Sequence, residues 1–121
     1  MEPTAQYRDV LSMILLKHAK LTPSHGRIEV FPVLDAERDH YCLVDAGWER
    51  GARVHSMIFF ARIVDEKIRL EWDGLGYGIT QELIEAGIPE GDIVHAWTEP
   101  CPPEATRRSM QSEAGVQTAP A

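Results

Sequence analysis

Apolar residues near the start of the chain recur at steps of three and four. This spacing gathers them on one face of a helix, so the pattern predicts a helix over residues 4–19. Residues 21–26 carry turn-forming proline, serine and glycine, which should end this helix before an apolar run at residues 28–34. Pro32 lies inside that run and cannot donate a backbone hydrogen bond, so the strand is expected at a sheet edge or a bulge. The helix face comprises Tyr7, Val10, Leu11, Ile14, Leu15 and His18.

The centre of the chain predicts an antiparallel meander. A first turn at residues 49–52 places Trp48 opposite Arg53. A second turn at residues 65–66 leads into the strand that follows. Each register collects apolar residues on one face, whereas a slip of one residue would send a whole set to the other face. In these registers Cys42 pairs with Phe59, which pairs with Trp72, and the apolar face comprises Cys42, Val44, Met57, Phe59, Ala61, Ile63, Ile68, Leu70 and Trp72.

The last third of the chain predicts a short helix at residues 79–86. Gly87 suits the left-handed conformation that closes many helices, and Pro89 prevents the helix from continuing. Residues 93–97 can add a final strand. The expected fold class is therefore α+β. It has an N-terminal helix, a four-stranded antiparallel meander, a short C-terminal helix and a possible final strand, with the helices on one sheet face.

Length and charge limit how the chain is organised and what it binds. A chain of 121 residues can bury one core, so we expect one domain over residues 1–98 and a flexible tail, rich in Pro, Ser and Ala, over residues 99–121. The net charge of -7 disfavours autonomous binding to a phosphate backbone, so DNA should be reached only through a partner. Cys42 and Cys101 lack a Cys-x-x-Cys spacing, which favours reduced thiols. No apolar run is long enough to span a bilayer, and we expect a cytoplasmic protein without membrane contact.

The chemically active residue types do not form a recognisable catalytic pattern. The residues that could be read as a metal site or an acid–base pair are Asp35, Glu37, Asp39 and His40. A polar turn between two strands is favoured instead, because aspartate stabilises turns by binding backbone amides. The glycine-rich stretch at residues 74–78 lacks the fingerprints of nucleotide-binding loops and is expected to be a flexible turn. We therefore predict no catalytic, metal-binding or cofactor-binding residue.

A second apolar patch is expected on the sheet face opposite the helices. It comprises Tyr41, Leu43, Ile58 and Phe60, flanked by Arg62 and Arg69. Apolar patches with polar rims often mark association sites. We expect these residues to bind a protein partner or a second copy of the chain, which would give a homo-oligomer. The alternative is that the N-terminal helix or the tail covers them.

Between Glu37 and Trp97 the chain carries an ordered series of short motifs. The series is Glu37-Arg38-Asp39-His40-Tyr41, Leu43-Val44, Gly47-Trp48-Glu49, Lys67-Ile68, Asp73-Gly74, Gly78-Ile79, Glu82-Leu83, Gly87-Ile88-Pro89 and Asp92-Ile93-Val94. It resembles the XisI family, the cyanobacterial controlling factors for excision of the fdxN DNA element, over roughly residues 5–97. The resemblance implies a regulatory, non-enzymatic protein that works beside a partner, XisH, in site-specific DNA recombination.

The resemblance leaves several functions to compare. The expected one is a controlling factor that docks on an XisH-like partner and alters assembly or direction of a recombinase at DNA ends. One alternative is a neutralising partner that masks a nuclease-like XisH relative. Another is a small hydrolase or nuclease subunit that uses Asp35, Glu37, Asp39 or His40. Control of recombination and neutralisation both need only a protein interface, so the residues do not separate them.

Overall fold

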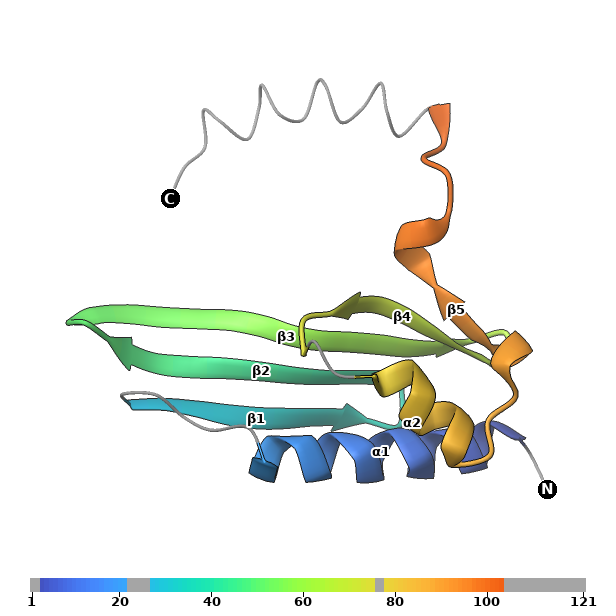
Figure 1. Cartoon of the computed structure of the whole chain (residues 1–121), viewed down its shortest axis with the longest axis horizontal. Coiled ribbons are helices and arrows are strands. Elements are labelled where there is room, and N and C mark those ends of the chain that lie inside the picture. Colours follow the sequence, from blue (N-terminus) through green and yellow to red (C-terminus); the bar gives the residue numbers. More distant parts are fainter. Residues whose placement is uncertain (1–2, 22–26, 76–77, 104–121) are drawn as a thin grey trace.

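The computed structural model describes residues 3–21, 27–75 and 78–103 (Figure 1). Its elements are α1 (Pro3–Leu21), β1 (Arg27–Asp35), β2 (His40–Glu49), β3 (Ala52–Val64), β4 (Lys67–Asp73), α2 (Ile79–Glu85), the short 3-10 helix η1 (Glu90–Asp92), β5 (Ile93–His95) and a second 3-10 helix, η2 (Ala96–Thr98). Within these ranges, no helix is long and apolar enough to cross a membrane. The element order confirms the predicted α+β class, including the final strand.

The strands of the described ranges form one sheet in the order β1-β2-β3-β4-β5. Strands β1 to β4 are an antiparallel meander, whereas β5 returns through α2 and runs parallel to β4. Pro32 lies in β1 at the sheet edge, as its missing donor predicts. The hairpin of β2 and β3 turns at Arg50 and Gly51, whose positive φ angles of 53° and 80° suit a tight turn. Figure 1 shows this end of the hairpin projecting beyond α1 and α2.

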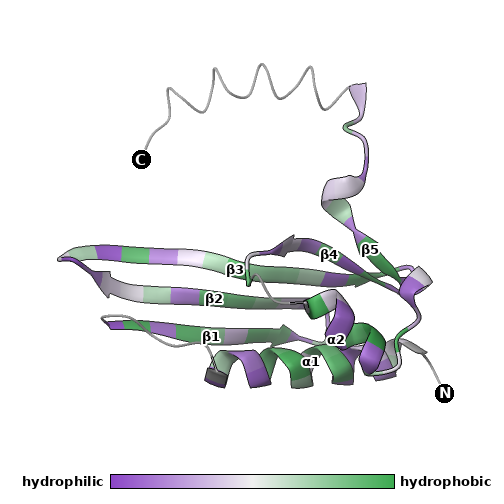
Figure 2. Ribbon diagram, viewed as in Figure 1, coloured by the Kyte–Doolittle hydropathy of each residue, from purple (hydrophilic) through white to green (hydrophobic). Residues whose placement is uncertain are grey.

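Helices α1 and α2 cover one face of the sheet and bury a common core. Leu11 and Leu15 of α1 and Leu83 of α2 have no exposed surface. The hydroxyl of Tyr7 donates a hydrogen bond to Asp92, which ties α1 to η1. Figure 2 shows the hydrophobic residues of both helices in green, beside those of the strands. The buried sheet residues include Tyr41, Leu43, Phe59, Ala61, Ile63, Ile68 and Leu70.

The end of α2 confirms the predicted glycine cap. Gly87 has a φ angle of +104°, which a residue with a Cβ rarely adopts. Its backbone N–H donates to the carbonyl of Ile84 at 3.0 Å, and that of Ile88 donates to the carbonyl of Leu83 at 3.1 Å. These bonds satisfy carbonyls at the helix end, while the buried Ile88 side chain folds back onto the core.

The pairing of β2 with β3 contains a bulge that the sequence does not reveal. Near the hairpin end, the predicted pairs are present. A bulge then inserts Ile58 as an extra residue of β3, and beyond it Cys42 pairs with Phe60. The predicted pair of Cys42 with Phe59 is therefore wrong.

A second bulge shifts the pairing of β3 with β4 away from the predicted register. Near the turn at residues 65–66, the predicted pairs are present. Glu71 is then an extra residue of β4, so Trp72 pairs with Phe60 and not with Phe59. Because side chains alternate between the faces of a strand, one inserted residue exchanges the faces of those beyond it.

The bulges move side chains in both directions between the two faces. Tyr41 and Leu43 lie in the core with no exposed surface, and Ile58 packs against it. The residues expected in the core that instead lie on the other face are Cys42, Val44, Met57 and Trp72. The predicted core was therefore right for Phe59, Ala61 and Ile63 of β3 and for Ile68 and Leu70 of β4. It was wrong for β2 and for the residues of β3 and β4 on the far side of each bulge.

Contacts with the sheet continue past the predicted end of the domain. Glu99, the first residue of the predicted tail, forms a salt bridge with Arg69 of β4 at 2.7 Å. Residues 104–121, which make up most of that tail, lie outside the described residues. The described chain thus remains attached to the sheet through at least Glu99.

Candidate protein-interaction face

The sheet face turned away from α1 and α2 carries apolar side chains, and we call it the open face. Residues paired across neighbouring strands project to the same side, so each set of partners forms a row. One row consists of Phe31, Val44 and Met57. The next row consists of Val33, Cys42, Phe60 and Trp72. Together these rows make an apolar strip across β1 to β4.

Much of this strip is in contact with solvent. The exposed fraction is 41% for Phe31, 46% for Met57 and 55% for Trp72. Phe60 is half-buried, and the ring of His40 lies edge-on to it with a centroid distance of 6.0 Å. Each Å² of apolar surface removed from water stabilises a complex by about 25 cal/mol before the costs of association. The open face is therefore a favourable surface for a partner.

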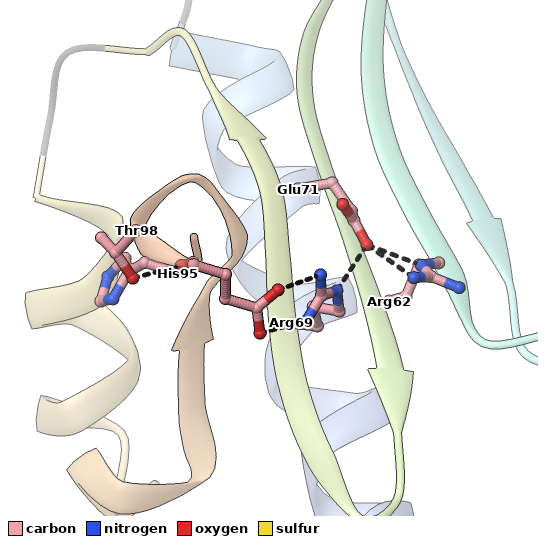
Figure 3. Close-up of polar contacts among 6 residues, drawn as sticks. Arg62, Arg69, Glu71, His95 and Thr98 are labelled. Carbon is pink, nitrogen blue, oxygen red and sulfur yellow. Dashed lines mark hydrogen bonds and ion pairs between the residues drawn. The ribbon is translucent and has the colours of Figure 1, made fainter. Parts of the chain in front are cut away.

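A polar row borders the apolar strip (Figure 3). The carboxylate of Glu71 accepts hydrogen bonds from Arg62 Nη2 at 2.7 Å and from Arg69 Nε at 2.9 Å. Arg69 also donates to both oxygens of Glu99, at 2.9 and 2.7 Å. Figure 3 shows the side chains of Arg62, Arg69 and Glu71 together in front of the strands, with α1 behind them. The network fixes the long arginine side chains at the rim of the open face.

The arginines hold the carboxylates of this network in the ionised form. Burial raises the pKa of Glu71, but hydrogen bonds from Arg62 and Arg69 outweigh it, and the net pKa lies below its usual range. A hydrogen bond from Arg69 likewise lowers the pKa of Glu99. Glu99 and Glu71 in turn raise the pKa of the Arg69 guanidinium. The rim therefore carries as many positive as negative groups, and its charge is balanced.

Comparison with known protein families identifies the relatives of this chain. Residues 1–109 match the XisI protein family. The chain belongs to the XisI family. This confirms the resemblance carried by the motifs between Glu37 and Trp97. No curated protein matches the chain.

Solved structures of XisI proteins share the fold. A crystal structure of a XisI-like protein from Anabaena variabilis ATCC 29413 has a TM-score of 0.75 and 29% sequence identity, over 80% of this chain and 89% of that one. The crystal structure of fdxN element excision controlling factor XisI from the same organism has a TM-score of 0.70 and 29% identity, over 81% of this chain and 89% of that one. The arrangement of α1, the meander and α2 is thus an XisI-like fold.

The residues predicted to form an interface fall on both faces of the sheet in this XisI-family protein. Those on the open face are Phe60, Arg62 and Arg69. Those on the helix-covered face are Tyr41, Leu43 and Ile58. The second group forms or contacts the core and presents no surface for a partner on the open face. The prediction was wrong for these residues because Ile58 is an extra residue of β3, so Leu43 and Tyr41, and not Val44 and Cys42, share the buried face with Phe59 and Ala61.

Sequence reasoning missed most of the apolar strip. The missed residues are Phe31, Val33, Cys42, Val44, Met57 and Trp72. For β1, a signal was present: residues 28–34 are almost continuously apolar, which indicates a strand with apolar side chains on both faces. The extra residue Glu71 decides which face Trp72 lies on, and no local sequence pattern predicts this bulge.

The acidic residues between β1 and β2 form the predicted polar turn. Asp35 Oδ1 accepts hydrogen bonds from the backbone amides of Glu37 at 3.0 Å and Arg38 at 3.1 Å. Asp39 accepts from Arg8 Nε at 2.7 Å and from the hydroxyl of Tyr41 at 3.2 Å. These carboxylates are thus engaged in holding the turn and in attaching it to α1.

The remaining candidate sites are a metal site and a phosphate-binding loop at the glycine-rich stretch. Within the ranges that the structure describes, no three His, Cys, Asp or Glu side chains are placed to hold a metal ion. Gly74, at the start of the glycine-rich stretch, donates its backbone N–H to the carbonyl of Ile58 at 2.7 Å. Gly76 and Tyr77 of the same stretch lie outside the described residues.

Proposed function

We propose that this protein is a non-enzymatic controlling factor for excision of a DNA element, and that it acts by binding an XisH-like partner through its open face. The family match and the related structure named as fdxN element excision controlling factor support a role in excision. A controlling factor without chemistry of its own needs a surface that recognises another protein. The open face is the surface that best meets this need.

The apolar strip is the observation that carries the proposal. Its two rows together cross β1 to β4, the first reaching β3 and the second β4, on the face that α1 and α2 leave uncovered. Aromatic and methionine side chains are enriched in the centres of protein interfaces, and Phe31, Phe60, Trp72 and Met57 supply these types. The arginine and glutamate network at the edge provides the polar rim that such interfaces usually have.

The geometry of the acidic turn supports a non-enzymatic role. A general acid or base must be available to a substrate, whereas Asp35 binds backbone amides and Asp39 binds Arg8 and Tyr41. We therefore expect the purified protein to show no metal-dependent hydrolysis of DNA, RNA or phosphoesters. Hydrolysis that persists through purification and disappears in Asp39→Ala or His40→Ala would contradict this part of the proposal.

The partner contact can be tested with charge substitutions on the open face. The protein is co-expressed with the XisH-like product of a neighbouring gene, and the affinity of the purified pair is measured by calorimetry. Phe60→Asp should weaken binding strongly, since it places an unpaired carboxylate in the interface. Met57→Asp is the second variant, because Met57 is more exposed than Phe60 and the substitution disturbs the fold less. Loss of an interface anchor commonly weakens binding by tens of fold.

Met13→Asp provides the matched control. Met13 is also an exposed apolar residue, but it lies on α1, away from the sheet. This variant should bind the XisH-like protein as the wild type does, and circular dichroism should show that all variants remain folded. Unchanged affinity in folded Phe60→Asp and Met57→Asp proteins would overturn the assignment of the open face. Failure of the wild-type pair to associate at all would overturn the partner itself.

A further inference from the structure

A hollow lies at the end of β4, where the open face meets η2. Its volume is about 460 Å³, and it is lined by Trp72, Asp73 and Trp97. The exposed fractions of Trp72 and Trp97 are 55% and 53%, so a ligand can reach both indole rings. The hollow therefore combines two large aromatic side chains with an acidic residue in its lining.

Each wall of the hollow is held by a neighbouring group. Gly74 leaves room for the indole of Trp72, because a Cβ at this glycine would lie only 2.9 Å from the indole nitrogen. Asp73 Oδ1 accepts a hydrogen bond from the backbone amide of Leu75 at 3.1 Å. Ligand sites whose side chains are fixed in advance lose less conformational entropy on binding.

The position of Trp97 depends on a chain of contacts through His95. The two rings meet edge-to-face with a centroid distance of 5.3 Å. His95 Nε2 lies 2.8 Å from Thr80 Oγ1 of α2, and the carbonyl of His95 accepts a hydrogen bond from Thr98 at 2.7 Å. Figure 3 shows His95 and Thr98 at the end of β5, beside β4. Trp97 is thus attached to the fold through β5 and α2.

The chemistry of the walls favours a cation over a neutral group. An indole ring attracts a positive charge to its face, and tryptophan does so best among the aromatic residues. The chain itself provides an example, since the guanidinium of Arg53 lies 5.5 Å from the ring centroid of Trp48. An acidic residue near such rings also attracts a cation, and Asp73 belongs to the lining of this hollow.

The charges around the hollow also favour a cationic ligand. Arg62 and Arg69 are paired with Glu71 and Glu99, so the neighbouring network is balanced, and among the described lining residues Asp73 is the charged one. The chain as a whole has a net charge of -7, which raises the local concentration of positively charged ligands.

We propose that the hollow of Trp72, Asp73 and Trp97 binds the cationic side chain, arginine or lysine, of a protein partner. The source of the cation rests on the proposed function, because a protein docked on the open face lies directly against Trp72. The apolar strip then provides the area of the interface. The hollow selects for a positive residue at one position of the partner.

Short peptides test the hollow without any partner protein. The full chain is titrated with acetylated and amidated glycyl-arginyl-glycine, with its lysine analogue, and with the citrulline analogue, which has the shape of arginine but no charge. Binding is followed by the indole N–H resonances of the tryptophans. The arginine or lysine peptide should shift the resonances of Trp72 and Trp97 and leave that of Trp48, which Arg53 already covers, in place. The citrulline peptide should bind roughly 2–5-fold more weakly, as expected for loss of an exposed cation–π contact.

Substitutions then assign the walls. Asp73→Asn keeps an oxygen for the amide of Leu75 but removes the charge, and Trp97→Leu removes one ring; each should weaken arginine-peptide binding roughly 2–5-fold. Trp48→Leu is the control and should leave the affinity unchanged. Equal binding of the citrulline peptide, or no shift of either resonance, would overturn the cation site. Because the peptides need no XisH-like protein, failure of the proposed function would not alter this result.

Discussion

Gly47 lies where the backbone of β1 passes against β2. It pairs with Ile28, and a Cβ at this position would lie 1.9 Å from the carbonyl oxygen of Arg27. The contact is with backbone and not with the end of a flexible side chain, so β1 itself must move to admit the methyl group. Gly47→Ala should therefore lower the free energy of unfolding by about 1–3 kcal/mol.

Urea unfolding measures this loss, and Gly91→Ala is its matched control. A Cβ at Gly91 meets no heavy atom within 4 Å, so the same substitution should leave the unfolding midpoint nearly unchanged. If both variants unfold at the wild-type midpoint, the close approach of β1 to Gly47 is absent in solution.

Asp39 makes the stability of the protein depend on pH. Hydrogen bonds from Arg8 lower the pKa of this carboxyl, against an opposing effect of burial. A carboxyl whose pKa is lower in the folded than in the unfolded protein stabilises the fold above its unfolded pKa. That contribution is lost as the pH falls from about 4 through the folded pKa.

Asp39→Asn tests the sign of this effect. Asparagine tolerates the left-handed backbone at this position, where φ is 58°, so the substitution removes mainly the charge. The variant should be about 1 kcal/mol less stable than the wild type at neutral pH, and the difference should shrink below about pH 4. Urea midpoints across this range give the measurement, with the exposed Asp9→Asn as control. A difference that stays constant down to acid pH would mean that the charge of Asp39 does not stabilise the fold.

At the scale of elements, the bulge opposite Leu43 and Val44 decides which side of β2 is buried. Leu43 has no exposed surface, whereas Val44 lies on the open face. Leu43→Ala should cost about 2–5 kcal/mol, as for other buried leucines, and Val44→Ala less than about 1 kcal/mol. Denaturant unfolding of the two variants compares them directly. A register without the bulge predicts the opposite order, so a larger loss for Val44→Ala would exclude the observed pairing.

The sequence predicted the helices and strands well, but it predicted only in part which side chains of the strands face the core. Helical periodicity located α1, and the turns at residues 49–52 and 65–66 located β2, β3 and β4. Residues 41–44 and 58–61 are all apolar, so the alternation that would show which side faces the core is missing in both segments. The bulges lie within or beside these segments, and their positions follow from packing between strands and helices. For the same reason, only Phe60, Arg62 and Arg69 of the open face could be named in advance.

At the scale of the whole molecule, the net charge of -7 determines how the protein meets DNA. Binding to duplex DNA depends on clustered Lys and Arg that displace counterions. In the described structure, Arg62 and Arg69 are paired with glutamates, and Arg8 is paired with Asp39. These arginines are therefore partly neutralised, and the isolated protein should hold DNA only weakly.

We expect the isolated protein to bind a labelled DNA duplex with a dissociation constant no tighter than roughly 10⁻⁴ M at physiological salt, and still more weakly as salt is raised. Addition of the XisH-like protein should produce a tighter complex that contains both proteins. Fluorescence anisotropy of the duplex, followed by sedimentation of the complex, measures both steps. Phe60→Asp should be excluded from the complex because it cannot dock, whereas Met13→Asp should be retained. Tight DNA binding by the isolated wild type would show that the protein binds DNA directly. It would contradict the proposal that the protein reaches DNA only through a partner bound to the open face.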